Sequence, residues 1–343
     1  MSSFCEKLLS AKLIKIVELT KIFAQYNKNQ YLCTEMMNMN NSTLVIGVLA
    51  RNCIDGLRNN ISRIEELGGM FKEYHVIVYE NDSTDGTKEC IMQWVENNGN
   101  VVAICEDLNQ VTIPNKSKYI LKPSKSEWRI QKMASFRNRV LQEVNKRFSP
   151  DYFCFLDVDI ESFSPQSVVE AMKKAPDDWG ALCASGHLYY SNPNGTDYPA
   201  NFQYDAYAFF PEGSKPEEMG RWVISHQCHL VSAWTAEELV RKQKFASCRS
   251  AFNGLAVYKW NVIKDLHYKV MQNKELKECG AAMCEHLPFH SDIILRGKKC
   301  YITGIMEVVY MHKKNTFLRC FNNWLDVYIA RIYRGLLKYN YQQ

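Results

Sequence analysis

Short apolar runs alternate with amphipathic stretches through the first half of the 343-residue chain. Leu44–Ala50, His75–Tyr79 and Val101–Cys105 are largely apolar runs, which predicts strands that are buried on both faces of a sheet. The segments between these runs have helical spacing and end near Gly68 and near Asn97. This order of strands and helices predicts a parallel sheet with right-handed crossovers.

The same order continues through the middle of the chain. A helix is predicted to begin near Ser124, because Glu127 follows three residues later and completes a capping box. The run Tyr152–Leu156 predicts another buried strand, and Pro165 predicts the first turn of the next helix. Gly180–Ser185 predicts a further strand. We therefore expect an α/β fold, with a Rossmann-like mixed sheet that carries helices on both faces.

The pattern changes from Gly186 onward. Residues 187–220 are rich in Tyr, Asn, Pro and Gly and show no clear period, which predicts long loops around a smaller second lobe. Val223–Ser232 and Ala256–Trp260 predict antiparallel strands, and Tyr301–Tyr310 predicts a late strand. We divide the chain into an N-terminal helix and linker (1–42), an α/β half (43–185), a second half (186–315) and a C-terminal helix (316–343).

The two terminal regions do not read as a membrane span or a signal peptide. Residues 4–26 predict an amphipathic helix, and charged residues interrupt its apolar segment Leu8–Phe23. Residues 324–339 predict a basic, aromatic helix. We therefore expect a cytoplasmic protein with at most peripheral membrane contact.

Composition and charge narrow the classes of function. The formal net charge of +5 is spread along the chain and forms no basic stripe, so we expect no nucleic-acid partner. A mild positive charge does suit an anionic small substrate. The 13 cysteines are scattered and form no CxxC pair with metal-site spacing, which favours reduced thiols.

Two carboxylates, Asp157 and Asp159, follow the apolar run Tyr152–Leu156. In an extended chain their side chains point the same way, while Val158 between them turns back into the protein. Neighbouring carboxylates repel unless a cation lies between them, and their hard oxygen ligands suit Mg²⁺ or Mn²⁺. The pair predicts a metal site at the ligand-binding edge of the sheet. The alternative is an acidic strand end that caps a helix or forms a surface ion pair.

Polar loops at the same predicted edge suggest nucleotide contacts. The loop from Glu80 to Thr87 follows the second strand, and Glu80 or Asp82 could bind a base or ribose. Arg51 closes the first strand and is a further candidate for nucleotide contact. The alternative is a capped helix start, with Asp85 as the acid of the first turn.

Arg137 falls on the apolar stripe of the helix that begins near Ser124. A long cation that faces inwards needs an anionic partner, because an unpaired buried charge is costly. That partner could be a phosphate, which Arg binds in a bidentate manner, or a structural aspartate. The adjacent Asn138 could reach the aspartate pair or a sugar hydroxyl.

Residues 284–292 bring several titratable groups together, and a deprotonation step needs a positioned carboxylate or imidazole. Glu285 is the first candidate, followed by His286 and Asp292. Cys284, His286 and His290 could instead bind zinc, but no distal CxxC completes a structural set. The remaining alternative is a polar helix start.

Two later features are weaker signs of a ligand-binding site. Gly254, after Asn253, would permit a close approach of the backbone to a ligand, or would simply form a turn. His312 follows the last predicted strand and could complete the metal coordination or be structural.

The order of these motifs resembles the GT-A nucleotide-sugar glycosyltransferases over residues 43–315. The resemblance is carried by the following segments in order: the loop 79–87, Met133–Arg139, Phe155–Asp159, Asn253-Gly254, Glu285-His286 and His312. Within that class, residues 129–141, 247–254 and those from Cys284 onward are most similar to the fungal capsule-associated mannosyltransferases. The Asp-Val-Asp strand is also similar to that of the yeast Golgi mannan mannosyltransferases.

The resemblance implies transfer of a sugar from a GDP- or UDP-sugar to a hydroxyl of a glycan or glycoconjugate. It implies Mn²⁺ or Mg²⁺ on Asp157, Asp159 and His312, with Arg137 adding positive charge beside the diphosphate. Glu285 would accept the acceptor proton in an inverting reaction or bind sugar hydroxyls in a retaining one. The other implied contacts are Arg51, Glu80, Asp82 and Asn138 for the donor nucleotide, and Asn253, Gly254 and Tyr207 for the acceptor.

Two other classes of protein compete with this interpretation. A sugar-phosphate nucleotidylyltransferase would need a glycine-rich phosphate loop after the first strand, where residues 47–52 read Gly-Val-Leu-Ala-Arg-Asn. A non-catalytic module that binds a sugar or nucleotide on the same fold also fits the sequence.

Overall fold

The computed structural model describes residues 39–111, 123–191, 197–314 and 325–335. The helix predicted for residues 4–26 lies outside these residues. Residues 325–335 form a helix, which agrees with the prediction for 324–339 as far as the described residues extend. No helix within the described ranges is both long and apolar enough to cross a membrane.

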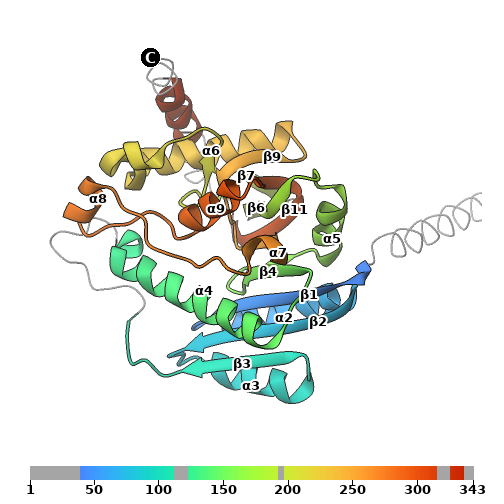
Figure 1. The fold of residues 1–343 in the computed structure, drawn as a ribbon. Helices are drawn as coiled ribbons and strands as arrows, with labels where there is room; N and C mark the ends of the chain where they lie inside the picture. Colours follow the sequence, from blue (N-terminus) through green and yellow to red (C-terminus); the bar gives the residue numbers. More distant parts are fainter. Residues whose placement is uncertain (1–38, 112–122, 192–196, 315–324, 336–343) are drawn as a thin grey trace, which may run out of the picture.

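Within the described residues the strands form one 11-stranded sheet, and its N-terminal half is parallel as predicted. Strands lie side by side in the order β3-β2-β1-β4 (Figure 1). Their bounds are β1 Met39–Ala50, β2 Phe71–Asn81, β3 Val101–Glu106 and β4 Tyr152–Asp157. All pairs in this half are parallel, so the carboxyl ends of β1, β2 and β4 meet at one edge.

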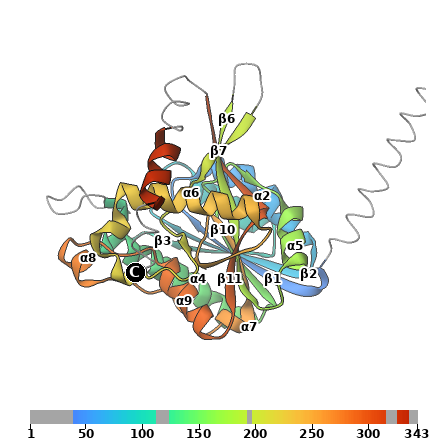
Figure 2. The same ribbon diagram turned by 90° about the horizontal axis from the view of Figure 1, so that it is seen from above.

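Alternation along β1 fills a core on each face of the sheet. Leu44, Ile46 and Val48 pack into one core cluster, which also holds apolar side chains of α2, α3 and α5. Val45 points to the opposite face and packs with side chains of α4. The helix bounds are α2 Ile54–Gly69, α3 Thr87–Asn97, α4 Glu127–Arg147 and α5 Pro165–Lys174. Figure 2 shows the sheet from above, with helices on both sides.

The start of α4 lies slightly later than predicted. Ser126 is its N-cap and accepts a hydrogen bond from the backbone N–H of Arg129 at 3.3 Å. Ser124 lies instead in a short 3₁₀ turn, Pro123–Lys125. Pro165 lies in the first turn of α5 as predicted, directly after the N-cap Ser164.

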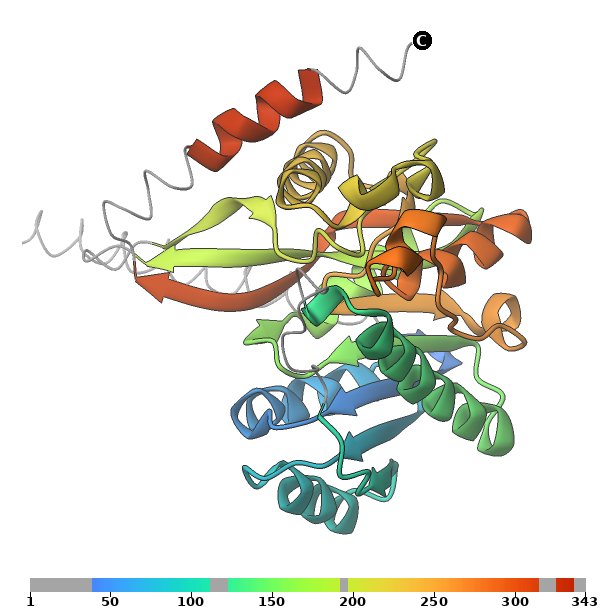
Figure 3. The same ribbon diagram turned by 90° about the vertical axis from the view of Figure 1, so that its left-hand side faces the viewer.

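The C-terminal half of the sheet is mixed. β10 (Leu255–Lys259) inserts antiparallel between β4 and β6 (Trp179–Ser191), and β11 (Lys299–Lys314) runs parallel to β6. Figure 3 shows β6, β7 and β11 extending beyond the rest of the sheet as an arm. The remaining strands are β5 Ser162–Phe163, β7 Asp197–Gln203, β8 Phe210–Pro211 and β9 Ala246–Ser250. The division at residues 185 and 186, which falls within β6, stays a prediction.

Two predictions for this half were wrong. Residues 223–232 form no strand: they belong to a 3₁₀ helix, Gly220–Ile224, and to α6, His226–Lys242. The short β-branched run suggested a strand, but Ser225 caps α6 by accepting the N–H of Cys228 at 3.0 Å. The segment predicted as loops contains the end of β6 and all of β7. The remaining helices are η2 Pro216–Glu218, α7 Trp260–Ile263, α8 Lys274–Glu278 and α9 His286–Leu295.

Candidate active site

Asp157 and Asp159 lie at the carboxyl end of β4, where the alternation predicted from sequence is present. Val158 is fully buried between them, whereas Asp157 is half-buried and Asp159 is exposed. Helix α2 packs closely behind this turn at Gly56, where an added Cβ would lie 2.2 Å from the carbonyl oxygen of Val158. Both carboxylates therefore project from a firmly supported turn.

Both aspartates line one pocket of about 190 Å³. Arg51 and Asn81 come to it from the ends of β1 and β2, and Arg129 comes from the first turn of α4. The pocket thus lies at the carboxyl edge of the parallel strands, which is the expected ligand-binding edge of an α/β sheet.

Arg137 is buried behind this pocket and joins two acidic groups. Its Nη2 lies 3.6 Å from Oδ1 of Asp157, and its Nε donates to Oε1 of Glu285 at 3.3 Å. Its guanidinium carbon lies 4.7 Å from the ring centre of Phe252 and 5.1 Å from that of Phe155. Although burial would lower the pKa of Arg137, Asp157 and Glu285 raise it, so the group stays charged.

The acids around Arg137 outnumber it. We call Asp157, Asp159, Asp205 and Glu285 the carboxylate cluster. Burial raises the pKa of Asp157 to about 7, and Asp159, Asp205 and Glu285 add to the rise while Arg137 opposes it. Burial and then Glu285 raise the pKa of Asp205 to about 6, and burial also raises that of Asp159. The cluster therefore favours a further positive charge.

The turn before β10 supports the aspartates from the other side. Asn253 and Gly254 have φ values of 56° and 82°, a conformation that glycine adopts at little cost. The carbonyl oxygen of Gly254 accepts the N–H of Asp157 at 2.8 Å. Asp205 and Asn253 exchange two hydrogen bonds of 3.3 Å between backbone and side chain. The predicted acceptor contact of Asn253 and Gly254 stays a prediction.

Glu285 and His286 lie together at the start of α9. Both side chains are buried, and the His286 ring stacks on Phe252 at 4.0 Å between ring centres. Burial, with Arg137 second, holds the pKa of His286 well below its usual range, so its imidazole is neutral. A neutral, stacked imidazole beside Glu285 supports the carboxylate as the stronger base candidate.

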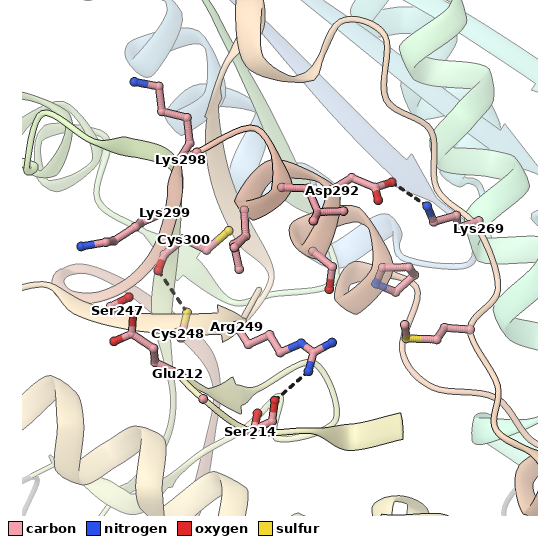
Figure 4. A pocket seen from close by; sticks show the side chains of 17 residues that line it. Glu212, Ser214, Ser247, Cys248, Arg249, Lys269, Asp292, Lys298, Lys299 and Cys300 are labelled. Carbon is pink, nitrogen blue, oxygen red and sulfur yellow. Dashed lines mark hydrogen bonds and ion pairs between the residues drawn. The ribbon is translucent and has the colours of Figure 1, made fainter. Parts of the chain in front are cut away.

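Asp292 is separated from that pair, contrary to the prediction. It lies nearly two turns further along α9, and its carboxylate accepts from Nζ of Lys269 at 2.7 Å. Figure 4 shows this ion pair at the rim of a different pocket of about 720 Å³. Asp292 is therefore assigned to that pocket rather than to the carboxylate cluster.

The zinc alternative finds no support in the same segment. The two ring nitrogens of His290 each lie 3.1 Å from a hydroxyl, one of Ser250 and one of Tyr258. In the described ranges no three His, Cys, Asp or Glu side chains are grouped so as to hold a metal ion.

The predicted nucleotide loop is held by a contact within it and by contacts with neighbouring segments. Glu80 is fully buried, and its Oε1 accepts the N–H of Ser83 at 2.8 Å. Oδ1 of Asp82 accepts the N–H of Asn109 at 2.7 Å, and Nη1 of Arg51 donates to the carbonyl of Gln110 at 2.9 Å. These bonds give Glu80 a turn-holding role and leave its nucleotide contact a prediction.

Three further site residues were predicted: Asn138, Tyr207 and His312. Both ends of the Asn138 amide bond the backbone of Tyr268, at 2.7 and 2.8 Å, rather than the aspartates, and its contact with a sugar stays a prediction. The hydroxyl of Tyr207 donates to the carbonyl oxygen of Ala282 and so is committed to the protein. The backbone of His312 pairs with Tyr189 in the arm, but its side chain lies outside the described part of the chain.

The structure adds residues that the sequence reasoning missed. Asp205 joins the carboxylate cluster, and Arg129 borders the pocket. Tyr204 stacks on Tyr310 of β11 at 3.9 Å between ring centres. Burial raises the pKa of both tyrosines, and the nearby Asp157 and Asp159 raise it further. Arg129 could have been found from its position, eight residues before Arg137 and hence on nearly the same helix face.

A model of the family described as cryptococcal mannosyltransferase 1 matches residues 45–292. The chain belongs to this family. The matched range includes all of β4, the carboxylate cluster and Arg129 and Arg137 of α4. The match confirms the predicted resemblance to this mannosyltransferase family. The mixed sheet with helices on both faces confirms the predicted α/β architecture, and its GT-A type stays a prediction.

Solved structures that are similar to this member of the cryptococcal mannosyltransferase 1 family share little sequence with it. One is the mannosyltransferase PcManGT from Pyrobaculum calidifontis, solved in complex with GDP-Man and Mn²⁺. It is 12% identical with a TM-score of 0.41, and the match covers 78% of this chain and 56% of the PcManGT chain. GalNAc-T7, solved with UDP, GalNAc and Mn²⁺, is 14% identical with a TM-score of 0.40, covering 80% and 44%. TarS 1-349 of S. aureus is 12% identical with a TM-score of 0.40, covering 79% and 60%.

The chain thus spans between 44% and 60% of the length of these three proteins. Such low identities and TM-scores transfer no substrate or metal to it. No curated protein matches the chain.

Proposed function

We propose that this protein transfers a sugar from a nucleoside diphosphate donor to a hydroxyl of a glycan or glycoconjugate, with a divalent metal ion. One observation carries the proposal: Asp157 and Asp159 border the same pocket as Arg51 and Arg129 at the carboxyl edge of the parallel strands. The acids suit a cation, and the arginines suit phosphate oxygens. The family to which the chain belongs favours a mannosyl donor.

The residues present fit Mn²⁺ or Mg²⁺. Magnesium in phosphate-binding sites is held through one or two carboxylates and the substrate's phosphates, rather than by a full protein cage. Asp157 and Asp159 supply those carboxylates, and the raised pKa of each shows that nearby positive charge would be favourable. When bound, the ion supplies a Lewis acid that neutralises the charge developing on the departing diphosphate.

Arg137 acts in this proposal as a positioning residue. Its guanidinium bonds Glu285 and lies beside Asp157, so it fixes the distance between the donor side and the acceptor side of the site. Both acids need this partner, because each would otherwise be a buried or half-buried charge without a counterion. The structural-aspartate alternative for Arg137 is thus the one that its contacts support.

Glu285 is the proposed base of an inverting transfer. Its carboxylate accepts the proton of the acceptor hydroxyl. At the same time the hydroxyl oxygen bonds to the anomeric carbon, and the bond from that carbon to the diphosphate breaks. Burial behind the aspartates shields this proton transfer from bulk water. In a retaining transfer the same carboxylate would bind sugar hydroxyls.

Release of nucleoside diphosphate tests the proposal. The purified chain is incubated with GDP-mannose, and in parallel with a panel of GDP- and UDP-sugars, with and without Mn²⁺. We expect slow hydrolysis of one donor that requires Mn²⁺ and falls at least about a hundredfold in Asp159→Asn. Asp177→Asn, an exposed acid outside the site, is the matched control and should keep wild-type turnover. Metal-independent turnover, or full activity in Asp159→Asn, would contradict the proposal.

A further inference from the structure

Arg129 occupies a distinctive place in the pocket that holds the aspartates. It lies in the first turn of α4, immediately after the N-cap Ser126. Its side chain lines the pocket together with Asp157 and Asp159, and its charge lowers the pKa of Asp159. It therefore borders the pocket itself, whereas Arg137 is buried and does not line it.

The guanidinium of Arg129 is only partly satisfied by the protein. Its Nη1 donates to the carbonyl oxygen of Ser124 at 3.3 Å, a long bond to a neutral acceptor. Its Nε is buried, and no acceptor among the described residues bonds it. No carboxylate of the described residues lies within ion-pair distance of it either. A buried donor without a partner is costly, and an anionic acceptor in the pocket would relieve that cost.

The other arginines near the pocket are already engaged. Arg137 is held by Asp157 and Glu285 and is enclosed by aromatic rings. Arg51 donates to the carbonyl of Gln110 and lies 3.7 Å from Asp82. Arg129 alone among these three lacks an acidic partner in the described part of the chain.

We propose that Arg129 binds the diphosphate of the donor, and that Arg137 does not contact it. The planar guanidinium of Arg129 suits two phosphate oxygens at once. The phosphate, rather than an acid of the protein, then balances the positive charge of Arg129. This inference rests on the proposed function, because it places a nucleoside diphosphate in the pocket beside the aspartates. It makes Arg129 a specificity residue for the diphosphate group.

The test separates the diphosphate from the nucleoside. Isothermal titration measures binding of GDP, UDP, guanosine and uridine to the full chain in the presence of Mn²⁺. Arg129→Met should weaken the affinity for whichever diphosphate wild type binds by about ten- to a hundredfold. It should leave the affinity for the matching nucleoside unchanged. Arg129→Lys, which keeps the charge but loses the planar fork, should recover part of the loss. Arg147→Met, an exposed arginine of the same helix, is the matched control and should bind as wild type does.

Thermal unfolding supplies a second measurement. Because Arg129 leaves a buried donor without a partner, Arg129→Met should be as stable as wild type, whereas loss of a purely structural arginine would lower the melting temperature. Equal GDP or UDP affinity in wild type and Arg129→Met, or equal weakening of diphosphate and nucleoside, would overturn the inference and leave the proposed function standing. If wild type binds neither diphosphate, both the proposed function and the inference fail.

Discussion

Two clusters of charged side chains in this molecule are built in opposite ways. The carboxylate cluster surrounds Arg137, whereas a second group, which we call the histidine cluster, joins β6 and β7 to α6 and β11. It consists of His187, Gln203, Glu237 and Glu307. Nε2 of His187 lies 2.9 Å from Glu237, and Nδ1 lies 3.2 Å from Glu307. Gln203 donates to Glu237 at 2.6 Å.

The pKa shifts in the two clusters favour opposite charge states. Burial would lower the pKa of His187, but its hydrogen bonds with Glu237 and Glu307 raise it to about 9. The bond from His187 lowers the pKa of Glu307, and it also lowers that of Glu237 against the effect of burial. Each shift favours the charged form. In the carboxylate cluster the pKa values of Asp157, Asp159 and Asp205 are all raised, so charge there is disfavoured.

The difference separates a structural role from a functional one. A cluster whose charges satisfy one another stabilises the fold, and here it fixes the base of the arm. In the carboxylate cluster like charges are in excess, and Nη1 of Arg137 and Nε2 of His286 beside it have no hydrogen-bond partner among the described residues. Under the proposed function, a bound ligand would relieve this unfavourable arrangement. Substitutions in the two clusters should therefore change stability in opposite directions.

The largest effect is expected for Glu237→Gln in the histidine cluster. Removing this charge leaves His187 and Arg241 with one acidic partner fewer, and breaking a buried ion pair typically costs about 3 kcal/mol or more. Urea unfolding should show a free energy of unfolding lower by about 3 kcal/mol. Glu170→Gln, in an exposed pair with Lys174, is the control and should change it by less than about 0.5 kcal/mol. Equal effects of the two substitutions would remove the contrast between the clusters.

The next effect is a pH dependence that belongs to His187. Its folded-state pKa of about 9 lies above its usual 6.5, so its contribution is complete below the lower value and is lost as the pH rises through the higher one. The stability difference between wild type and His187→Asn should shrink by about 3 kcal/mol between pH 6.5 and pH 10. Unfolding curves at those two pH values measure it. A difference that stays constant would mean that His187 is neutral in the folded protein.

The smallest effect, opposite in sign, is expected for Asp159→Asn in the carboxylate cluster. Removing one like charge relieves repulsion, so the free energy of unfolding without metal should rise by about 0.5 to 1 kcal/mol. The same variant should lose the stabilisation that Mn²⁺ with GDP or UDP gives to wild type. A loss of stability without metal would show that Asp159 has a structural role instead.

The sequence was sufficient where a motif and a secondary-structure period coincide. The strand Tyr152–Leu156 and the alternation of Asp157, Val158 and Asp159 are local properties, and the structure confirms both. The parallel half of the sheet follows from four such strands and the helices between them. Even the inward position of Arg137 follows from its place on the apolar stripe of α4.

Other parts depend on contacts that the local sequence does not contain. Asp205 enters the carboxylate cluster through long-range hydrogen bonds with Asn253, and no motif surrounds it. Asn138 follows Arg137 directly, so it lies about 100° around the helix and faces Tyr268 instead. Asp292 is seven residues from Glu285, which along a helix is about 10 Å, too far for a shared proton transfer.

The central claim is that Asp157 and Asp159 together bind a divalent metal beside a nucleoside diphosphate. The most direct measurement is the electron paramagnetic resonance signal of free Mn²⁺ during titration with the protein and GDP or UDP. We predict that wild type depletes the free signal far more strongly with the diphosphate than without it, and that Asp157→Asn and Asp159→Asn do not. If both variants deplete free Mn²⁺ as wild type does, the metal is bound elsewhere and the account is contradicted.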